Sequence, residues 1–372
     1  MKSVIDRTSL LRPLGHVQSV VERRNTIPIL SNVLLDASDG RLSLTATDMD
    51  MDIIESVDCN VLQEGIVTVP AHTLYDIIRK LPDGCDVSLE SNAEGSHLSV
   101  QAGRSNFTLP LLPADEFPTM SGDQLPCSFN LSASDARILI DRTRFAISNE
   151  ETRYYLNGIY IHSAESNNVP ILRAVATDGH RLARVEVPLP DGAAQMPSVI
   201  IPRKAVVEMR KLIEDSEGDI LVSLSESKLR FGKGDTVLTT KLIDGTFPDY
   251  ERVIPKGNDK LMEVNCRDLA EVVDRVATIS TEKSRSVKLQ LNEGILILSA
   301  TSPENGTARE EVEVKYSSEA IEIGFNSRYL LDIANQIEGQ VIEFSLADPG
   351  SPTIVRDQDD HTSLYVLMPM RV

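Results

Sequence analysis

The sequence lacks the features of a membrane or secreted protein. It has no apolar run of about 18 residues, the length that a membrane-spanning helix needs, and its N-terminus has no charged segment followed by an apolar one. The cysteines are few, and they show no metal-binding spacing and no C-x-x-C pair: Cys59, Cys85, Cys127 and Cys266. We therefore expect a soluble cytoplasmic protein with free thiols and no membrane partner.

Signatures of metal and cofactor binding are missing as well. The six histidines are dispersed and form no zinc motif. The sequence contains neither a G-x-x-x-x-G-K-[ST] loop nor a G-x-G-x-x-G motif after a strand, so nothing in it is typical of a phosphate-binding loop. The sequence predicts no cofactor and no metal site.

Positive charge is scarce, but it is unevenly distributed. The formal net charge is −19, which by itself argues against nucleic acid, because DNA binding requires cations that neutralise phosphates. Apolar spacing predicts six helices, at residues 6–25, 71–81, 132–147, 203–215, 265–285 and 326–338. Together they carry +4, so the rest of the chain carries −23 (−19 − 4). This split is explained either by a mildly positive surface or by ordinary solvated helix faces.

The feature that organises the chain is a threefold repeat. Each copy begins with a strand, a helix and a hairpin, and the hairpins end at Thr47-Asp48, Thr177-Asp178 and Thr301-Ser302. Each copy continues with a second strand, helix and set of strands. Such a period indicates repeated structural units. The sequence therefore predicts an α+β fold of three similar domains, each with two amphipathic helices packed on antiparallel sheets, at residues 1–124, 125–256 and 257–372.

The middle repeat contains the segment with the most chemical character, Ala176 to Leu182. Asp178 and His180 lie close enough in sequence to form a base and its orienting acid. No Ser or Cys nucleophile with a recognisable motif accompanies them, and the other repeats lack the pair, which argues against a hydrolase or isomerase. Gly179-His180-Arg181-Leu182 occurs in this repeat alone, and a glycine there suits the wall of a pocket.

Two other segments have more than one explanation. The C-terminus, Tyr365 to Val372, is apolar and includes Met368-Pro369-Met370; it is either a last core strand or part of a groove for a partner. Arg153-Tyr154-Tyr155 is either ordinary aromatic packing or a contact for phosphate. A monomeric scaffold without any role on DNA also remains open at this point.

Several blocks in the same order resemble one family, the bacterial DNA polymerase III sliding clamps, or beta subunits. The matching blocks are Pro28-Ile29-Leu30, Gly103-Arg104-Ser105 with Phe107, and residues 112–118, 153–158, 176–182, 247–250 and 368–371. The resemblance covers essentially the whole chain. It implies a non-catalytic processivity subunit that acts in DNA replication, located in the cytoplasm with the nucleoid. It also implies a head-to-tail homodimer that closes into a ring, with helices inside and sheets outside, around duplex DNA without sequence specificity.

The resemblance further implies client proteins that share one pocket. These are the DNA polymerase III alpha subunit, the clamp loader delta subunit, other DNA polymerases and mismatch-repair or ligase-type proteins, each docking a short Gln-Leu/Phe motif. The implied pocket residues are Leu156, Thr177, Gly179, His180, Arg181, Leu182, Pro248, Arg252, Val253, Asn326, Tyr329, Val366, Met368, Pro369, Met370 and Arg371.

The same comparison implies two further sets of residues. The DNA-facing candidates are Arg24, Arg79, Lys80, Arg137, Tyr154, Tyr155, Arg203 and Lys204, of which Arg79, Lys80 and Arg137 are added from their helix positions. The dimer candidates are Arg104, Phe107, Leu109, Thr278, Ile279 and Glu304, with an ion pair expected between Arg104 and the acidic stretch near Glu304. Thr278 departs from the bulkier apolar residue common in the family, and Glu150 adds negative charge beside the expected DNA path.

Overall fold

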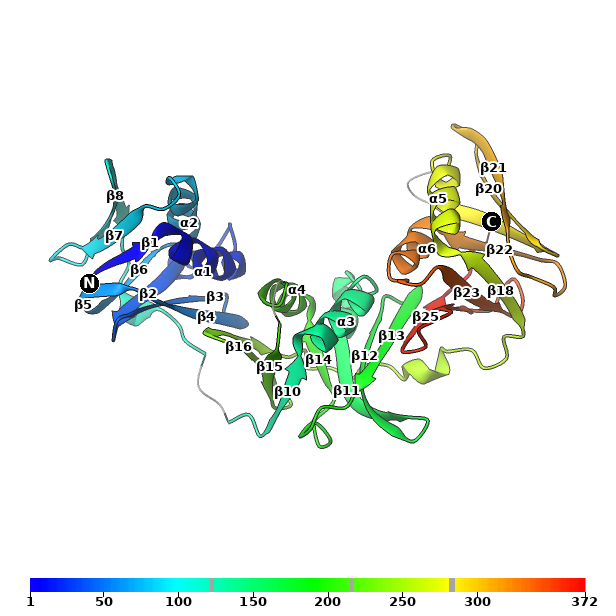
Figure 1. Cartoon of the computed structure of the whole chain (residues 1–372), viewed down its shortest axis with the longest axis horizontal. Coiled ribbons are helices and arrows are strands. Elements are labelled where there is room, and N and C mark those ends of the chain that lie inside the picture. The colour runs from blue at the N-terminus through cyan, green and yellow to red at the C-terminus, as the bar shows by residue number, and fades with distance from the viewer. Residues whose placement is uncertain (121–123, 215–216, 281–284, 372) are drawn as a thin grey trace. The chain divides into compact units, whose positions relative to one another are not determined.

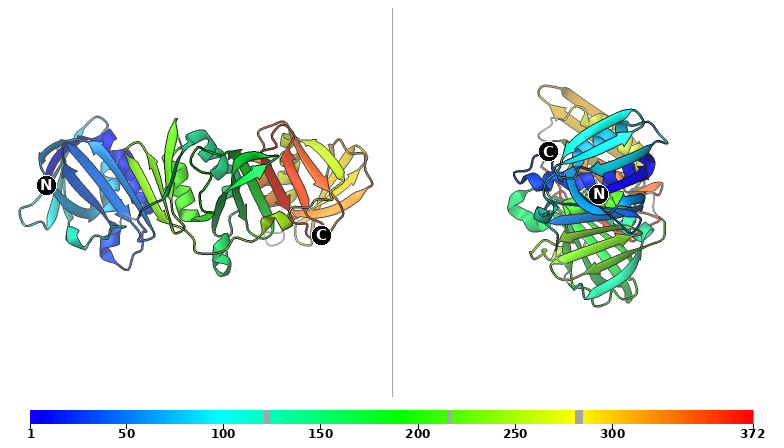
Figure 2. Two further views of the ribbon diagram at one scale, coloured as in Figure 1. Left: turned by 90° about the horizontal axis from the view of Figure 1, so that it is seen from below. Right: turned by 90° about the vertical axis from the view of Figure 1, so that its left-hand side faces the viewer.

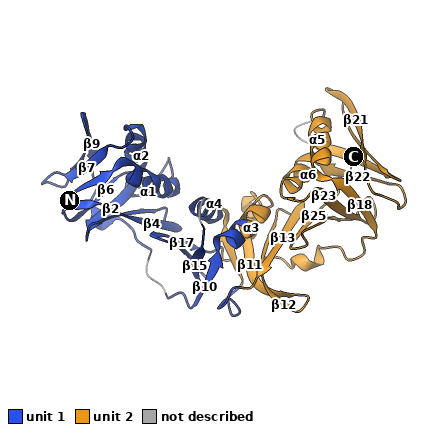
Figure 3. Ribbon diagram, in the orientation of Figure 1, with its two compact units in different colours: residues 1–137, 190–197, 204–242 blue, residues 138–189, 198–203, 243–372 orange. Residues whose placement is uncertain are grey.

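The computed structural model describes residues 1–120, 124–214, 217–280 and 285–371. These residues form two compact units (Figure 3). Unit 1 comprises residues 1–137, 190–197 and 204–242, and unit 2 comprises residues 138–189, 198–203 and 243–372. The predicted domain limits at 124 and 256 stay a prediction, and residues 121–123, beside the first of them, lie outside the described residues.

Unit 1 is built from two antiparallel sheets. One has eight strands in the order β10-β15-β16-β17-β4-β3-β2-β6, and the other has five in the order β5-β1-β7-β8-β9. The strands are β1 (Lys2–Asp6), β2 (Asn32–Ser38), β3 (Arg41–Thr47), β4 (Met51–Asp58), β5 (Asn60–Gln63), β6 (Gly65–Pro70), β7 (Asp86–Ser91), β8 (His97–Ala102), β9 (Ser105–Pro110), β10 (Cys127–Ser132), β15 (Asp219–Leu224), β16 (Lys228–Lys233) and β17 (Thr236–Lys241). Helices α1 (Arg7–Val20) and α2 (Ala71–Lys80) pack against each other, and α1 also packs on β3 and β4 (Figure 1).

Unit 2 repeats this plan. An eight-stranded sheet has the order β14-β11-β12-β13-β25-β24-β23-β18, and a four-stranded sheet has the order β21-β20-β19-β22. The strands are β11 (Gly158–Ser166), β12 (Val169–Thr177), β13 (Arg181–Pro188), β14 (Val199–Pro202), β18 (Lys260–Asn265), β19 (Ser286–Asn292), β20 (Ile295–Ser302), β21 (Gly306–Glu313), β22 (Ile321–Asn326), β23 (Val341–Leu346), β24 (Thr353–Asp357) and β25 (Ser363–Leu367). Helices α5 (Cys266–Ala277) and α6 (Ser327–Ala334) pack together. The predicted α+β fold with antiparallel sheets is confirmed.

The repeats share the way in which a strand leads into a helix. The residue before the first helix of each repeat has a side chain that accepts a hydrogen bond from the backbone N–H three residues later. These pairs are Asp6 with Ser9, Ser132 with Asp135, and Asn265 with Asp268. Such N-caps satisfy donors that the helix leaves unpaired. Two of the caps precede helices of equal length, α3 (Ala133–Arg144) and α5, while α4 is Arg203–Leu212.

Each predicted helix extends beyond the observed one, and the difference is largest for two of them. The helix predicted at 6–25 ends at Val20, because Val21 already has extended backbone angles. The helix predicted at 265–285 ends at Ala277, and residues 281–284 of that prediction lie outside the described residues. No helix within the described ranges is long and apolar enough to cross a membrane.

Each unit contains one join between two repeats, where the sheet of one continues into the sheet of the next. In unit 1 the third residue of β17, Leu238, pairs with the third of β4, Ile53. In unit 2 the third residue of β25, Tyr365, pairs with the third of β13, Ala183, so that the red strands of Figure 2 continue the green ones. The two joins therefore have the same register.

Candidate functional site

A cavity of about 350 Å³ opens in unit 2 where β13 and β25 join. Four structural segments surround it: the 3₁₀ helix η3 (Glu151–Leu156), the turn between β12 and β13, the segment with η4 (Tyr250–Arg252), and the end of β25. The lining residues are Arg153, Tyr155, Leu156, Thr177, Gly179, Arg181, Leu182, Pro248, Tyr250, Val253, Val366 and Met368. Most of these side chains are apolar, which suits a ligand with apolar anchors.

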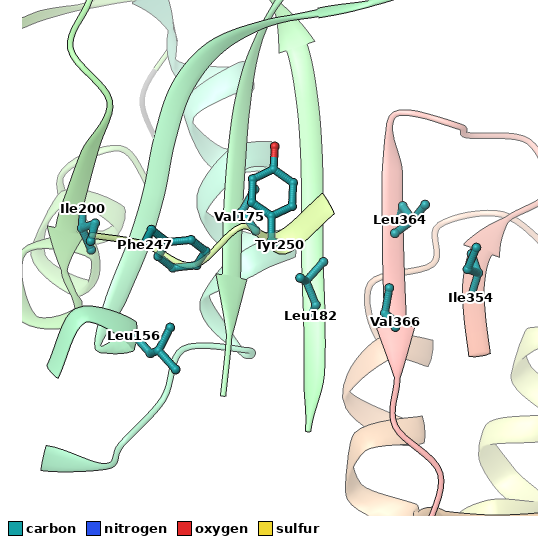
Figure 4. Packing of buried hydrophobic residues seen from close by; sticks show 9 residues of the cluster. All are labelled: Leu156, Val175, Leu182, Ile200, Phe247, Tyr250, Ile354, Leu364 and Val366. Atoms are coloured by element: carbon teal, nitrogen blue, oxygen red, sulfur yellow. The ribbon is translucent and has the colours of Figure 1, made fainter. Parts of the chain in front are cut away.

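The apolar part of the wall continues into a buried cluster of side chains. Its members are Leu156, Val175, Leu182, Ile200, Phe247, Tyr250, Ile354, Leu364 and Val366 (Figure 4). Phe247 stacks on Tyr160 with ring centroids 4.8 Å apart and an interplanar angle of 4°. Because these side chains interlock with the sheet, the apolar wall is formed before any ligand arrives.

Tyr250 is held from behind by a buried polar network. Its hydroxyl accepts a hydrogen bond from Arg173 Nη1 at 2.9 Å and lies 3.0 Å from His162 Nε2. Arg173 also pairs with Glu186 at 2.8 Å and with Glu251 at 3.0 Å. Burial lowers the pKa of His162 and raises the pKa of Tyr250, so the imidazole and the phenol are both neutral near pH 7. The network fixes the ring of Tyr250 at the cavity wall.

The turn between β12 and β13 explains the Thr-Asp motif of the sequence. Thr177 Oγ1 donates to the carbonyl of Arg181 at 2.6 Å, and Asp178 Oδ1 accepts from the backbone N–H groups of His180 and Arg181 at 2.9 and 3.0 Å. Asp178 is therefore used as a turn-forming acceptor. The candidate pair Asp178 and His180 is not brought together as a base and an acid.

Gly179 leaves room for a cation on the rim of the cavity. Its φ is +88°, and a Cβ there would lie 2.5 Å from Arg153 Nη1. Arg153 Nη2 donates to the carbonyl of Asp178 at 3.0 Å, and the guanidinium also pairs with Glu150 at 2.6 Å. Arg153 thus lies across the turn, and we missed it as a pocket residue although it precedes the two tyrosines in the sequence.

Arg181 ties the turn to α6. Its guanidinium pairs with Asp178 at 3.1 Å and with Asp332 at 2.5 Å, and it lies 4.3 Å from the ring centroid of Tyr329. It also donates to the carbonyl of Phe145 at 2.5 Å. The side chain is 8% exposed, so this cation is both paired and buried. Arg181 stabilises the join between β13 and β25 as well as lining the cavity.

The structure brings together nine of the sixteen predicted pocket residues as cavity lining: Leu156, Thr177, Gly179, Arg181, Leu182, Pro248, Val253, Val366 and Met368. The other seven, which do not line it, are His180, Arg252, Asn326, Tyr329, Pro369, Met370 and Arg371. Among them, His180 stacks on Tyr329, Asn326 caps α6, and the backbone N–H of Met370 donates to Gly324. Tyr250 and Tyr155 also line the cavity; the first was absent from the predicted set, and the second was assigned to DNA.

The predicted DNA-facing residues differ in how accessible they are. Arg24, Arg79, Lys80 and Tyr154 are exposed. Arg137 donates to the carbonyl of Ile213 at 2.9 Å. Arg203 bonds to Asn149 and Ile147, and burial lowers its pKa. Lys204 pairs with Asp48 and Glu22.

Four of the six predicted dimer residues lie on or just before the outer strand of a smaller sheet. Phe107 is 37% exposed on β9, whereas Leu109 is buried. Arg104 precedes β9, and Glu304 precedes β21; both are exposed. Thr278 and Ile279 follow α5.

Comparison with known proteins gives a consistent result. Residues 1–121, 130–249 and 251–371 match the N-terminal, central and C-terminal domains of the DNA polymerase III beta subunit. The chain is 55% identical over 372 residues to the beta sliding clamp of Caulobacter vibrioides and 38% identical over 373 residues to that of Escherichia coli, covering all of each chain. It matches the crystal structure of a sliding clamp from Bartonella birtlesii bound to griselimycin with a TM-score of 0.97, at 50% identity and full coverage of both chains. The chain, with its three clamp domains, belongs to the family of bacterial DNA polymerase III beta subunits, the beta sliding clamps.

Proposed function

We propose that this protein is a non-catalytic processivity subunit that encircles duplex DNA as a head-to-tail homodimer in the cytoplasm. The proposal depends on two edge strands of this sliding clamp, β9 and β21. The strands at the corresponding positions of the other repeats are not edges, because they pair with each other inside the chain. β9 is the outer strand of one sheet and corresponds to β17 and β25; β21 is the outer strand of another and corresponds to β4 and β13. Unpaired edges of this kind invite pairing with a second chain.

The register of the missing join follows from the two that are present. In both observed joins, the third residue of one strand pairs with the third residue of the other. For β9 and β21 this places Phe107 opposite Ala308 of a second copy, as Tyr365 lies opposite Ala183. The same register places Arg104 opposite Glu311, so the ion pair that we expected near Glu304 belongs at Glu311. Two such joins close a symmetric head-to-tail ring.

The charge of the helices supports contact with DNA. Within their observed bounds the six helices carry fourteen Lys and Arg against eight Asp and Glu, a net charge of +6 in a chain of −19. A modest cationic surface attracts phosphates without reading bases, and its attraction is screened by salt, which permits sliding. The exposed cations that we assign to this surface are Arg79 and Lys80 in α2, together with Arg24, which follows α1.

The unit 2 cavity is the proposed dock for client proteins. Its apolar wall suits the Leu and Phe side chains of a short motif, and the polar rim at Arg153 and Thr177 suits a Gln amide. The proposed clients are the DNA polymerase III alpha subunit, the clamp loader delta subunit, other DNA polymerases, and mismatch-repair or ligase-type proteins.

Retention on circular DNA tests the ring directly. The protein is assembled on nicked circular duplex DNA with a clamp loader and ATP, washed at high salt, and the DNA is then cut once. We expect retention on the circle and loss after linearisation, because a ring is held by topology rather than by affinity. Equal retention before and after the cut would contradict encirclement.

A peptide-binding measurement tests the dock. A labelled Gln-Leu-x-Leu-Phe peptide should bind the intact protein, and binding should fall when Leu156, buried at the cavity, is replaced by Asp. The matched control is Leu261→Asp, at an exposed leucine on β18, which should leave the affinity unchanged. Equal affinity of the Leu156 variant would place the dock elsewhere.

A further inference from the structure

The joins inside the chain share a pattern of backbone hydrogen bonds at their two ends. At one end, the sixth residue of β4 or β13 donates its N–H to the residue before β17 or β25: Ser56 to Asp235 at 3.2 Å, and Glu186 to Thr362 at 2.9 Å. At the other end, the bonds run in the opposite direction: Lys241 to Asp50 at 2.8 Å, and Met368 to His180 at 2.9 Å. Each observed join is therefore closed at both ends.

The proposed intermolecular join cannot form the second of these bonds. The residue of β9 that corresponds to Lys241 and Met368 is Pro110, which has no backbone N–H. That position faces the missing partner strand, because the next residue, Leu111, donates its N–H inward to Ser96 at 3.0 Å. The carbonyl of the partner's acceptor position, Asn305, is left without its donor.

Packing at the centre of the intermolecular join is also reduced. In unit 2, Tyr365 packs against Phe145, the first residue after α3, with ring centroids 5.8 Å apart. The corresponding residue after α5 is Thr278, since both helices have twelve residues after equivalent caps. Phe107, which corresponds to Tyr365, would meet this threonine in a second copy. An aromatic pair contributes more than an aromatic ring beside a small polar side chain.

The cation that strengthens the unit 2 join has no counterpart either. Arg181 is the first residue of β13, and the first residue of β21 is Gly306. The ion pairs of Arg181 with Asp178 and Asp332 therefore have no equivalent between copies, nor in the unit 1 join, where β4 begins with Met51, so they strengthen the unit 2 join alone.

We propose that the join between β9 and β21 of two copies is a weakened version of the internal joins, and that Pro110 and Thr278 set the rate at which it opens. The proposal rests on the ring proposed above and deepens it. A ring that must admit DNA has to open at one kind of place while its other joins stay closed. Loss of an end bond lets the strands separate from that end first.

Subunit exchange tests this idea. Unlabelled and ¹⁵N-labelled dimers are mixed, and native mass spectrometry follows the mixed dimer. Pro110→Ala restores the N–H and should slow exchange about fivefold, the effect of one net hydrogen bond. Pro113→Ala is the matched control, because Pro113 lies after β9 at the start of a 3₁₀ helix, and it should leave the rate unchanged. Thr278→Phe should slow exchange further, and this gain should vanish when Phe107 is replaced by Ala.

Each outcome decides one claim. Slower exchange for Pro110→Ala with an unchanged control supports the proposal, whereas exchange at the parent rate overturns the role of Pro110. Slowing by Thr278→Phe that persists without Phe107 overturns the proposed contact. If the parent protein forms no dimer, or is equally retained on linear DNA, the ring itself fails, and this result is separate from a ring whose exchange Pro110 does not control.

Discussion

The joins in unit 1 and unit 2 are formed by corresponding strands in the same register, but the side chains on one face differ. Leu182 and Met368 line the cavity in unit 2, whereas Asp52 and Lys241 occupy the corresponding positions in unit 1. Asp52 is buried, and its Oδ2 accepts from the backbone N–H of Met120 at 2.9 Å. The fold therefore supplies two similar sites, and a few side chains decide which of them is an apolar cavity.

The turns beside the two joins make the same point. Thr47 and Asp48 form the hydrogen bonds that Thr177 and Asp178 form in unit 2. Met49 adopts a φ of +75° at the position of Gly179, so the left-handed conformation belongs to the turn itself. The glycine of unit 2 adds the space in which Arg153 lies. What looked like a catalytic motif in the sequence is a turn that only one repeat has adapted into a rim.

Removing the cation of the unit 2 join should have the largest effect. Arg181→Met leaves Asp178 and Asp332 without their buried partner, so we expect the free energy of unfolding to fall by about 3–5 kcal/mol. Urea denaturation at fixed protein concentration measures this. The control, Arg267→Met, breaks an exposed pair with Glu271 on α5 and should cost less than about 1 kcal/mol. Equal losses for the two variants would show that Arg181 does not stabilise the join.

Making the unit 2 cavity polar should affect binding next. Leu182→Asn keeps the branching and the number of side-chain heavy atoms of leucine but replaces its methyl groups by polar atoms, as Asp52 does in unit 1. We expect the affinity for the Gln-Leu-x-Leu-Phe peptide to fall about tenfold or more. Fluorescence anisotropy measures it, with Leu182→Met as an apolar control that should change affinity little. An unchanged affinity for the Asn variant would mean that Leu182 does not contact the ligand.

Most of the architecture could be predicted from sequence because it depends on local patterns. Apolar spacing located the helices, and the Thr-Asp repeats located corresponding hairpins. The length of a helix depends on where its last turn finds partners, which explains why the predicted helix 265–285 was too long. The roles of Arg153 and Lys204 depend on residues distant in sequence: Arg153 crosses Gly179, and Lys204 pairs with Asp48.

The pocket shows a similar limit. Tyr250 belongs to a block shared with the sliding clamps, but its place in the cavity wall depends on the buried Arg173, which is distant in sequence and donates to its hydroxyl. Tyr329 does not line the cavity but packs against Arg181, and Asn326 does not line it but caps α6. The sequence of a segment does not reveal which of its side chains faces the cavity.

Replacing the buried Asp52 in unit 1 should have a smaller effect, on the free energy of unfolding. Burial raises the pKa of this carboxyl, so its contribution to stability is full below its unfolded pKa of about 3.9 and is lost as pH rises. Asp52→Asn does not titrate and keeps an acceptor for Met120 N–H. We expect it to be more stable than the parent by about 1 kcal/mol at pH 7, with the difference shrinking toward pH 4. Urea denaturation across this range measures it, and a constant difference would exclude titration of Asp52 as the cause.

The smallest expected effect concerns the support of Tyr250 in unit 2. His162 Nδ1 lies 3.0 Å from the carbonyl of Ser163, so it carries the hydrogen, and Nε2 accepts from the hydroxyl of Tyr250. Because burial lowers the pKa of His162, the stability that the neutral ring provides is present above its unfolded pKa of about 6.5 and is lost as pH falls. A protonated ring would point a second donor at a hydroxyl that already accepts from Arg173.

His162→Phe separates this effect from general acid destabilisation. At pH 7.5 the variant lacks the hydrogen bond to Tyr250, so its free energy of unfolding should be about 1 kcal/mol lower than that of the parent. At pH 5 the parent loses the same bond by protonation, so the difference between the two proteins should narrow. Urea denaturation of both proteins at the two pH values measures the difference directly. If the difference in unfolding free energy stays constant or widens on acidification, folding does not lower the pKa of His162. Tyr250 would then be held by Arg173 alone.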